Sequence, residues 1–306
     1  MSKEKLKELL PKIENNKITG AIELCSGLLG EEPFEEKLND DDIILLSKAL
    51  AKNSSITEVS LIGQNFGDKG AIALASIEHL RILDLWGCNV KVSGATALAK
   101  SHLEILNLRE NHLGYNEENI NDYELFSNMI NAFICNKTIK QLDLSSSYIP
   151  SKLIARLIAE NDTIKELSLE SIFLTDEALQ DIKANKTLKV LDISGNNITD
   201  KGAIYIYKNT NLETLYINRS EITDKGAYFL SKSNFLKKLY IYDTKITVKG
   251  LQYFFYSKLN TVESQGQFVS WEESRGFKTA FNTLIELRDS GEYEIEALGE
   301  EYTEYE

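Results

Sequence analysis

Apolar and polar residues follow a fixed pattern that recurs along the chain, most clearly between residues 188 and 250. Three successive passes begin at Leu188, Leu212 and Leu236, so the period is 24 residues. Within each pass, leucine or isoleucine occupies positions 1, 4, 6 and 11. Because positions 4 and 6 lie two residues apart, the pattern predicts a short strand with one buried face. The polar residue at position 9, such as Asn196, can hydrogen-bond the backbone where the chain leaves the strand.

A helix start follows each predicted strand. Thr199 and Thr223 are suited to be helix N-caps, and the aspartate after each is favourable in the first helical turn because it opposes the helix dipole. Gly202 and Gly226 are each followed by alanine, and these small residues let the helix lie close to the strands. One strand and one helix cannot bury their own apolar faces, whereas stacked units form a continuous core.

The same frame can be followed along most of the chain. Repeats begin at Ile56, Leu80, Leu103, Ile139, Ile164, Leu188, Leu212 and Leu236, with a weak ninth at Leu259. The intervals between the first eight starts are 24, 23, 36, 25, 24, 24 and 24 residues. The frame, LxxLxLxx(N/C/T)xL, is the leucine-rich repeat signature. We therefore predict an α/β fold, a leucine-rich repeat solenoid (horseshoe) with a parallel concave β-sheet, convex helices and helical caps at both ends.

The predicted organisation has four parts. They are an N-terminal cap with a degenerate first repeat (1–55), the repeats (56–262), a C-terminal helical cap (263–290) and an acidic tail (291–306). The cap should start with an amphipathic helix over 3–14, which Pro11 is expected to interrupt. About a dozen extra residues near 114–125 explain the 36-residue interval. They form either a binding loop or a tolerated surface loop, and the sequence favours neither.

Charge and cysteine content limit the classes of binding partner and the cellular compartment in which the protein is expected. The net charge of −13 argues against nucleic acid and anionic membranes as partners, and it favours a partner protein with a basic surface. The three cysteines show no paired spacing, which suits a reducing compartment. No apolar run is long enough to span a membrane, and the first residues lack the apolar region of a signal peptide. We expect a cytoplasmic protein that is monomeric when unbound.

Residue patterns for catalysis are nearly absent. His79 and His102 precede the first leucine of adjacent repeats, but no third metal ligand has suitable spacing, so a structural role is favoured. Neither a GxxxxGK[ST] loop nor a GxSxG element occurs. We expect no enzyme activity, no cofactor and no metal. Asn-x-Ser/Thr sequons begin at Asn53, Asn136, Asn185 and Asn218, and we interpret them as turns at repeat junctions.

The repeat register predicts which side chains line the concave sheet. A middle column lies between positions 4 and 6, and further columns precede and follow it. The predicted protein-binding residues on these columns are Ile62, Ile82, Asp84, Trp86, Arg109, Asp143, Glu166, Glu170, Asp192, Tyr216, Tyr240 and Tyr242. Aromatic residues and arginine dominate interface energetics, and an acidic strip between two apolar patches suits a basic ridge on a partner. Alternatively, these side chains only fill a solvated sheet or contact the capping segments.

The segments Gly70-Ala71, 94–99 (GATALA), Gly202-Ala203 and Gly226-Ala227 resemble the GALA form of leucine-rich repeat, found in ribonuclease-inhibitor-like and bacterial effector proteins. The Lys/Asn/Ile-rich composition and Glu-rich end also resemble leucine-rich repeat effectors of intracellular bacteria such as Legionella. That resemblance implies virulence, type IV secretion through an acidic signal, and action in the host cytosol on a host protein or another effector. The implied function is non-catalytic capture, and possible inhibition, of a partner protein or enzyme. The alternative is an adaptor that recruits a substrate to a host ubiquitin ligase.

Overall fold

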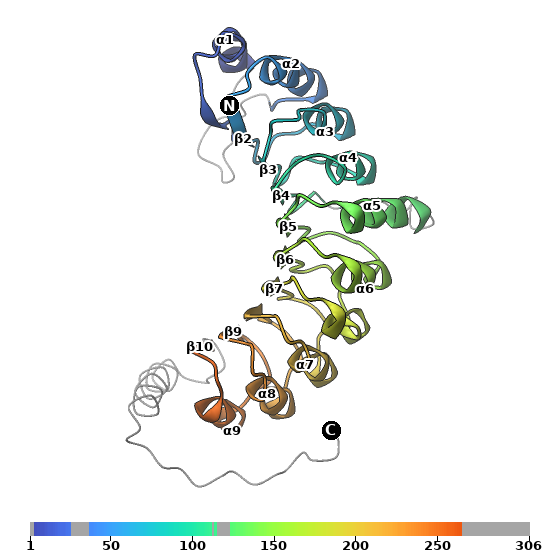
Figure 1. The fold of residues 1–306 in the computed structure, drawn as a ribbon, viewed down its shortest axis with the longest axis vertical. Helices are drawn as coiled ribbons and strands as arrows, with labels where there is room; N and C mark the ends of the chain where they lie inside the picture. The colour runs from blue at the N-terminus through green and yellow to red at the C-terminus, as the bar shows by residue number, and fades with distance from the viewer. Residues whose placement is uncertain (1–2, 26–36, 112, 115–122, 265–306) are drawn as a thin grey trace.

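The repeats build one open sheet whose ten parallel strands follow each other in chain order (Figure 1). The computed structural model describes residues 3–25, 37–111, 113–114 and 123–264. The strands are β1 (Gly20–Glu23), β2 (Ile56–Ser60), β3 (Ile82–Asp84), β4 (Ile105–Asn107), β5 (Gln141–Asp143), β6 (Glu166–Ser168), β7 (Val190–Asp192), β8 (Thr214–Tyr216), β9 (Lys238–Tyr240) and β10 (Thr261–Glu263). The predicted leucine-rich repeat solenoid is confirmed.

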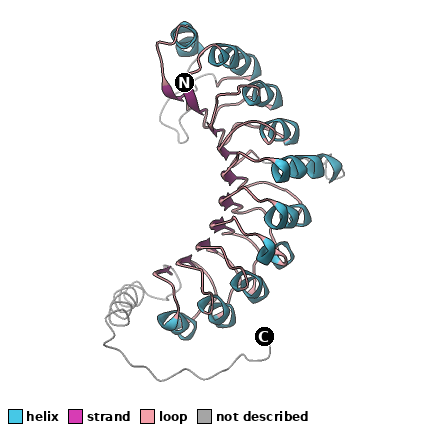
Figure 2. Cartoon of the chain, in the orientation of Figure 1, coloured by secondary structure: helices cyan, strands magenta, loops and turns pink. Residues whose placement is uncertain are grey.

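Helices line the outer side of the curve and strands line its inner side (Figure 2). The α-helices are α1 (Lys3–Glu14), α2 (Asp40–Ala51), α3 (Asp68–Ala75), α4 (Val92–Leu98), α5 (Tyr123–Cys135), α6 (Ser151–Glu160), α7 (Asp200–Tyr207), α8 (Asp224–Ser231) and α9 (Val248–Gln252). Short 3-10 helices are η1 (Asp176–Leu179), η2 (Ile182–Ala184) and η3 (Tyr253–Tyr256). Within the described ranges, no helix has the length and apolar character needed to cross a bilayer.

The core lies between the two layers and is built from the residues at positions 1, 4, 6 and 11 together with inward-facing helix residues such as Ala203 and Ile206. In the pass that begins at Leu188, the side chains of Leu191, Ile193 and Ile198 are fully buried. Burying a leucine or isoleucine side chain contributes about 1.5–3 kcal/mol, and each repeat contributes several of them. Repetition of this burial in every unit holds the strands in register.

Aspartates join several of the repeats to the next one. Asp200 Oδ1 accepts hydrogen bonds from Thr223 N at 2.8 Å and Gly226 N at 2.9 Å, and its Oδ2 accepts from Thr223 Oγ1 at 2.7 Å. Thr223 is the N-cap of α8, as the sequence predicts. The aspartate therefore caps the helix of the following repeat, rather than serving only its own helix. Gly226 makes this possible, because an added Cβ would lie 2.6 Å from Asp200 Oδ1.

Asparagines form two further ladders between repeats. Asn196 donates to Leu169 O at 2.8 Å and accepts from Leu174 N at 2.9 Å, which confirms the predicted role of position 9. At the junctions, Asn53, Asn136 and Asn185 donate through their side-chain amides to backbone oxygens of the preceding unit. These three sequons are junction turns. Asn218 differs, because its amide donates to Ser194 Oγ at 3.1 Å on the strand side.

The N-terminal helix differs from the expectation at Pro11. Helix α1 continues through Pro11 to Glu14, so the predicted interruption is wrong. Proline removes one helical hydrogen bond but its fixed φ is compatible with a helix. Burial of Leu6 and Ile13 on either side of it stabilises the continuous helix. Most of the predicted insertion, and nearly all of the predicted C-terminal cap and acidic tail, lie outside the described residues.

Candidate functional site

The three concave columns follow the predicted register. Backbone pairing aligns Ser60 with Asp84, then Asn107, Asp143 and onward to Tyr240 in the middle column. In the preceding column, Ile82 is aligned with Ile105, and Glu166 with Val190. The column that follows the strands is joined by bonds such as Gly87 N to Arg109 O at 2.9 Å. Sequence periodicity therefore places the candidate side chains correctly along the sheet.

Trp86 and Arg109 form a packed pair near the N-terminal end of the sheet. The Arg109 guanidinium carbon lies 5.7 Å from the centroid of the Trp86 ring, which is within cation–π range. Ile62 and Ile82 are half-buried in the same part of the face. Within the described part of the chain, the buried Trp86 Nε1 has no hydrogen-bond partner. The indole is thus held by ring packing and leaves its other surface half-exposed.

Glu170 is the centre of a salt-bridge network that the repeat pattern does not predict. Its Oε2 lies 2.6 Å from Arg109 Nη1, and its Oε1 is paired with Arg219 Nη2. The Glu170 side chain is only 17 % exposed. Because two cations share this carboxylate, the middle of the face is less anionic than the predicted acidic strip.

The network depends on small residues in the intervening repeats. Arg109 reaches Glu170 across the repeat that carries Ser145, and Arg219 reaches it across the repeat that carries Gly195. An added Cβ at Gly195 would lie 3.8 Å from Arg219 Nη2 and 2.6 Å from Ser171 Oγ. Arg219 itself has a φ of 51°. Other repeats have glycine at the same position, and glycine favours a left-handed backbone conformation. These glycines indicate in the sequence that the backbone at Arg219 is left-handed and that its side chain leaves the backbone in an unusual direction.

The aspartates of the middle column form turns at the strand ends. Ser145 N donates to Asp143 Oδ1 at 2.8 Å, and Ser194 N donates to Asp192 Oδ1 at 2.9 Å. Asp84 accepts from Trp86 N at 3.1 Å in the same way. Burial raises the pKa of all three carboxyls above the ordinary aspartate value. The three carboxylates fix the backbone of the residues in the following column, and so they orient the side chains of that column. Glu166, by contrast, is exposed.

Tyrosines form the second cluster, toward the C-terminal end of the sheet. The rings of Tyr216 and Tyr240 are stacked with centroids 4.2 Å apart and planes 10° apart. The Tyr242 hydroxyl donates to the Glu263 carboxylate. Burial and this carboxylate raise the pKa of Tyr242, so its hydroxyl stays protonated as a donor. The structure therefore brings together the three tyrosines that the sequence placed there.

Other reactive side chains have structural surroundings. Cys88 Sγ donates to Leu61 O at 3.0 Å, and burial raises the pKa of this thiol to about 12. His79 is half-buried, and His102 is exposed on a groove of about 880 Å³ between α4 and α5. Among the residues that the structure describes, no group of three or more His, Cys, Asp or Glu is placed to hold a metal ion.

The predicted site residues do not include an aromatic pair that lies at the strand-to-helix edge. Tyr148 and Phe173 stack with centroids 5.3 Å apart, and Phe173 is 61 % exposed. Both occupy position 10 of their repeats, where Asn89 and Asn197 stand in other repeats. An aromatic residue at a position that is polar elsewhere was the signal in the sequence.

The net charge of −13 does not describe the repeats. The described residues carry 31 Lys and Arg against 29 Asp and Glu, a net charge of +2. The remaining 18 Asp and Glu, with 3 Lys and Arg, belong to the other segments of the chain. The argument from total charge against polyanionic partners therefore does not apply to the surface of the solenoid.

A comparison with protein-family models agrees with the repeat architecture. The family model described as Leucine Rich repeat matches residues 76–99, 184–206 and 208–231. These segments contain β3, β7 and β8 with the turns that follow them. The sequence matches no curated protein. The structure is similar to the crystal structure of an internalin C2 from Listeria monocytogenes, at 16 % identity over 84 % of this chain and 92 % of that chain, with a TM-score of 0.44.

Proposed function

We propose that this protein is a non-catalytic binding module whose concave face captures one partner protein. The observation that carries the proposal is the pair of ordered aromatic clusters, Trp86 with Arg109 and Tyr216 with Tyr240. The clusters are about five strands apart, or roughly 24 Å at the usual strand spacing. Solenoids use their concave surfaces for extended contacts, and this separation lies within one standard interface.

Both clusters are held in place before any partner binds. Stacking fixes the Tyr216 and Tyr240 rings, and the bond to Glu170 fixes Arg109 over Trp86. Side chains that are already ordered lose less conformational entropy on association. Asp143, Asp192 and the exposed Glu166 remain between the clusters, so the proposed partner has a basic surface flanked by apolar anchors.

The wider biological role is proposed on the family resemblance. The protein acts as a bacterial virulence effector, translocated by type IV secretion, that binds a host protein or another effector in the host cytosol. Where the captured protein is an enzyme, occupation of its active site by the concave face inhibits it.

The test compares two double variants by partner capture followed by titration calorimetry with the purified partner. Trp86→Ala with Tyr240→Ala removes one anchor from each cluster, and we expect affinity to fall at least 100-fold, because truncation of a hot-spot residue costs about 2 kcal/mol or more. Ile72→Ala with Phe235→Ala is the control, since both side chains are exposed away from the concave columns. Equal affinity of the two double variants would refute concave-face capture.

The alternative adaptor function places ligase recruitment on the N-terminal cap. Deleting the first twenty residues would not test it cleanly, because Leu6 and Ile13 of α1 belong to the core. Substitution of the exposed Lys7 and Glu8 leaves that core intact. Loss of a ligase component from captured complexes in Lys7→Ala/Glu8→Ala, with concave binding preserved, would favour the adaptor function.

A further inference from the structure

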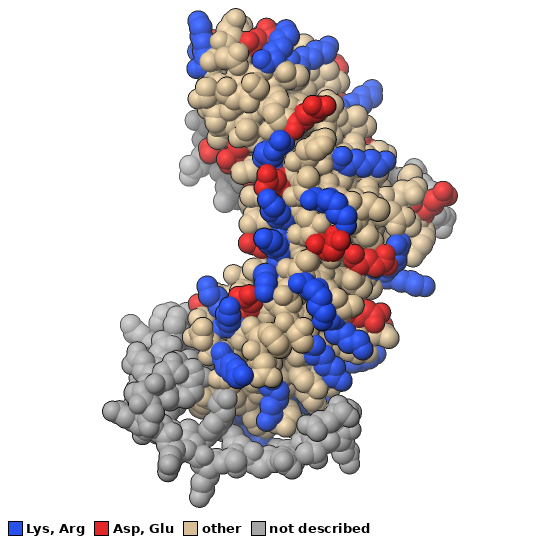
Figure 3. Space-filling view, viewed as in Figure 1, with Lys and Arg blue, Asp and Glu red and all other residues tan. Residues whose placement is uncertain are grey.

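A row of lysines runs along the N-terminal ends of the strands, outside the concave columns. It occupies position 2 of four repeats, and we define the lysine row as Lys140, Lys165, Lys189 and Lys237. Glu213 holds position 2 in the repeat between the last two. Backbone bonds place neighbours side by side: Lys165 N donates to Lys140 O at 2.8 Å, and Lys189 N donates to Lys165 O at 2.7 Å. Figure 3 shows Lys and Arg side chains following one another along the stack on the face toward the viewer.

Too few carboxylates accompany this row to neutralise it. Lys140 pairs with Glu104 at 2.6 Å, and Glu213 is shared by Lys189 at 2.8 Å and Lys237 at 2.6 Å. Arg81 also shares Glu104, at 3.9 Å. At the centre, Lys165 is exposed and has no acidic partner among the described residues. Four cations therefore share two carboxylates on the surface, and Lys165 adds a fifth positive charge that neither of them pairs.

Acidic residues missing from this surface are concentrated in one segment of the same chain. Residues 292–306, the Glu-rich segment, contain seven Glu and no Lys or Arg. Three of these, Glu292, Glu294 and Glu296, are spaced two residues apart. Alternate side chains of an extended peptide fall on one side, so this spacing can present three carboxylates to consecutive lysines.

We propose that the Glu-rich segment binds the lysine row of its own chain. Reach is no obstacle, because the 28 residues from Ser264 to Glu292 can span about 90 Å when extended. The end of β10 lies only four strands from β6, or roughly 20 Å. Binding in cis also gives the segment a high effective concentration, which compensates for weak individual ion pairs. The segment then shields the lysine row from polyanions. This contact is independent of concave-face capture, since none of the four lysines belongs to the concave columns.

Zero-length carbodiimide crosslinking of the full chain, mapped by mass spectrometry, tests the proposal. An equal mixture of unlabelled and ¹⁵N-labelled protein separates links within one chain from links between two chains. We expect the glutamates of 292–306 to couple to the lysine row within one chain, and the yield to fall several-fold at about 1 M salt, where the Debye length is about 3 Å.

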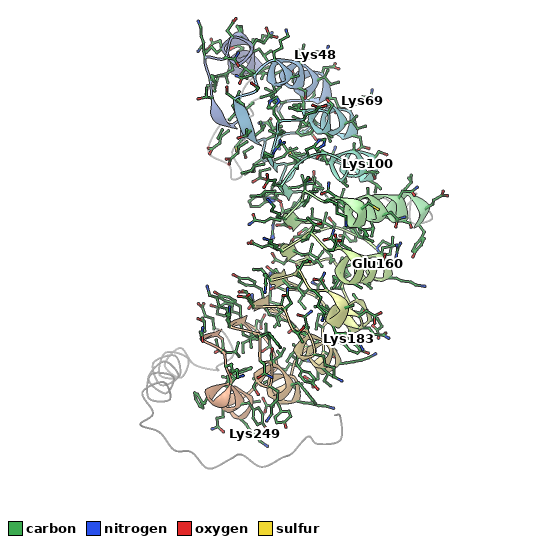
Figure 4. All side chains as sticks on the ribbon, in the orientation of Figure 1. Lys48, Lys69, Lys100, Glu160, Lys183 and Lys249 are labelled. Carbon is green, nitrogen blue, oxygen red and sulfur yellow. The ribbon has the colours of Figure 1, made fainter. Side chains whose placement is uncertain are left out.

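Matched charge reversals provide the control. Lys140→Glu/Lys165→Glu/Lys189→Glu removes three of the four amines, so the readout is the remaining Lys237, whose links to 292–306 should be abolished. Lys48→Glu/Lys69→Glu/Lys100→Glu, on exposed positions of the helical side, should preserve the links to the lysine row (Figure 4). Unchanged thermal unfolding of both triple variants verifies the fold. Links spread equally over Lys48 and Lys69, links that survive the first triple reversal, or links only between differently labelled chains would each overturn the proposal.

Discussion

Capping of a helix by an aspartate of the preceding repeat can be tested at Asp200. Replacing Asp200 with alanine leaves Thr223 N and Gly226 N, at the start of α8, without their acceptor. An unsatisfied buried donor costs about 1–3 kcal/mol, and the lower half of that range applies because Thr223 N is only partly buried. Each of the two donors thus costs about 1–2 kcal/mol, so we expect the free energy of unfolding to fall by about 2–4 kcal/mol. Asp181→Ala is the control, because Asp181 is exposed and makes no cap bond, and it should change stability by less than about 0.5 kcal/mol.

A double-mutant cycle with Gly226→Ala tests the geometry behind this magnitude. The new methyl group would lie 2.6 Å from Asp200 Oδ1 and 2.5 Å from Ile222 Cγ2, so Gly226→Ala alone should destabilise the protein by about 1–3 kcal/mol. Once Asp200 is alanine, only the Ile222 contact remains, and the double variant should be about 1 kcal/mol more stable than the sum of the single effects. Urea unfolding followed by circular dichroism, with amide exchange at Gly226, measures both quantities. If Asp200→Ala unfolds at the same urea concentration as Asp181→Ala, capping between repeats contributes no stability and the reasoning fails.

Three further predictions concern single side chains. Glu170→Gln removes the charge shared by Arg109 and Arg219, so calorimetry should show weaker affinity for a basic partner and less salt dependence, with little change in unfolding temperature. Asp143→Asn keeps an oxygen that accepts the hydrogen bond from Ser145 N. In the wild type, burial raises the folded-state pKa of Asp143, so the protein loses stability as pH rises through that pKa. In urea titrations at pH 7, Asp143→Asn should be at least as stable as the wild type, and the difference in stability should vanish below about pH 3.9. A variant that is less stable than the wild type at pH 7 would contradict this. Maleimide at pH 7 should modify the exposed Cys25 and Cys135 but not Cys88 until urea unfolds the chain, and rapid native labelling of Cys88 would contradict its burial.

Sequence periodicity was sufficient for the strand order and for the concave columns because each position depends only on counting from a buried leucine. The same counting could not find the Arg219–Glu170 pair, which joins residues 49 apart through side chains that cross an intervening repeat. Nor could it predict that η1 and η2 replace an α-helix after β6, although Thr175-Asp176 has the same start as other repeats. Pro11 shows the opposite case, in which tertiary burial of Leu6 and Ile13 outweighs a local preference. A repeat period carries no information about how far a side chain reaches, or about whether tertiary packing outweighs a local conformational preference.

The capping aspartates also affect how a repeat array can gain further repeats by duplication. A block of 24 residues that begins at Leu212 carries Asp224, which caps the next helix, and receives its own cap from Asp200 of the block before it. Tandem duplication of that block would give every copy both halves of the bond, with the glycine that leaves room for it. Genetic duplication in whole periods thus creates no uncapped helix, whereas an insertion that separates an aspartate from the following threonine and glycine does. This makes the 24-residue block a natural unit of growth for the array.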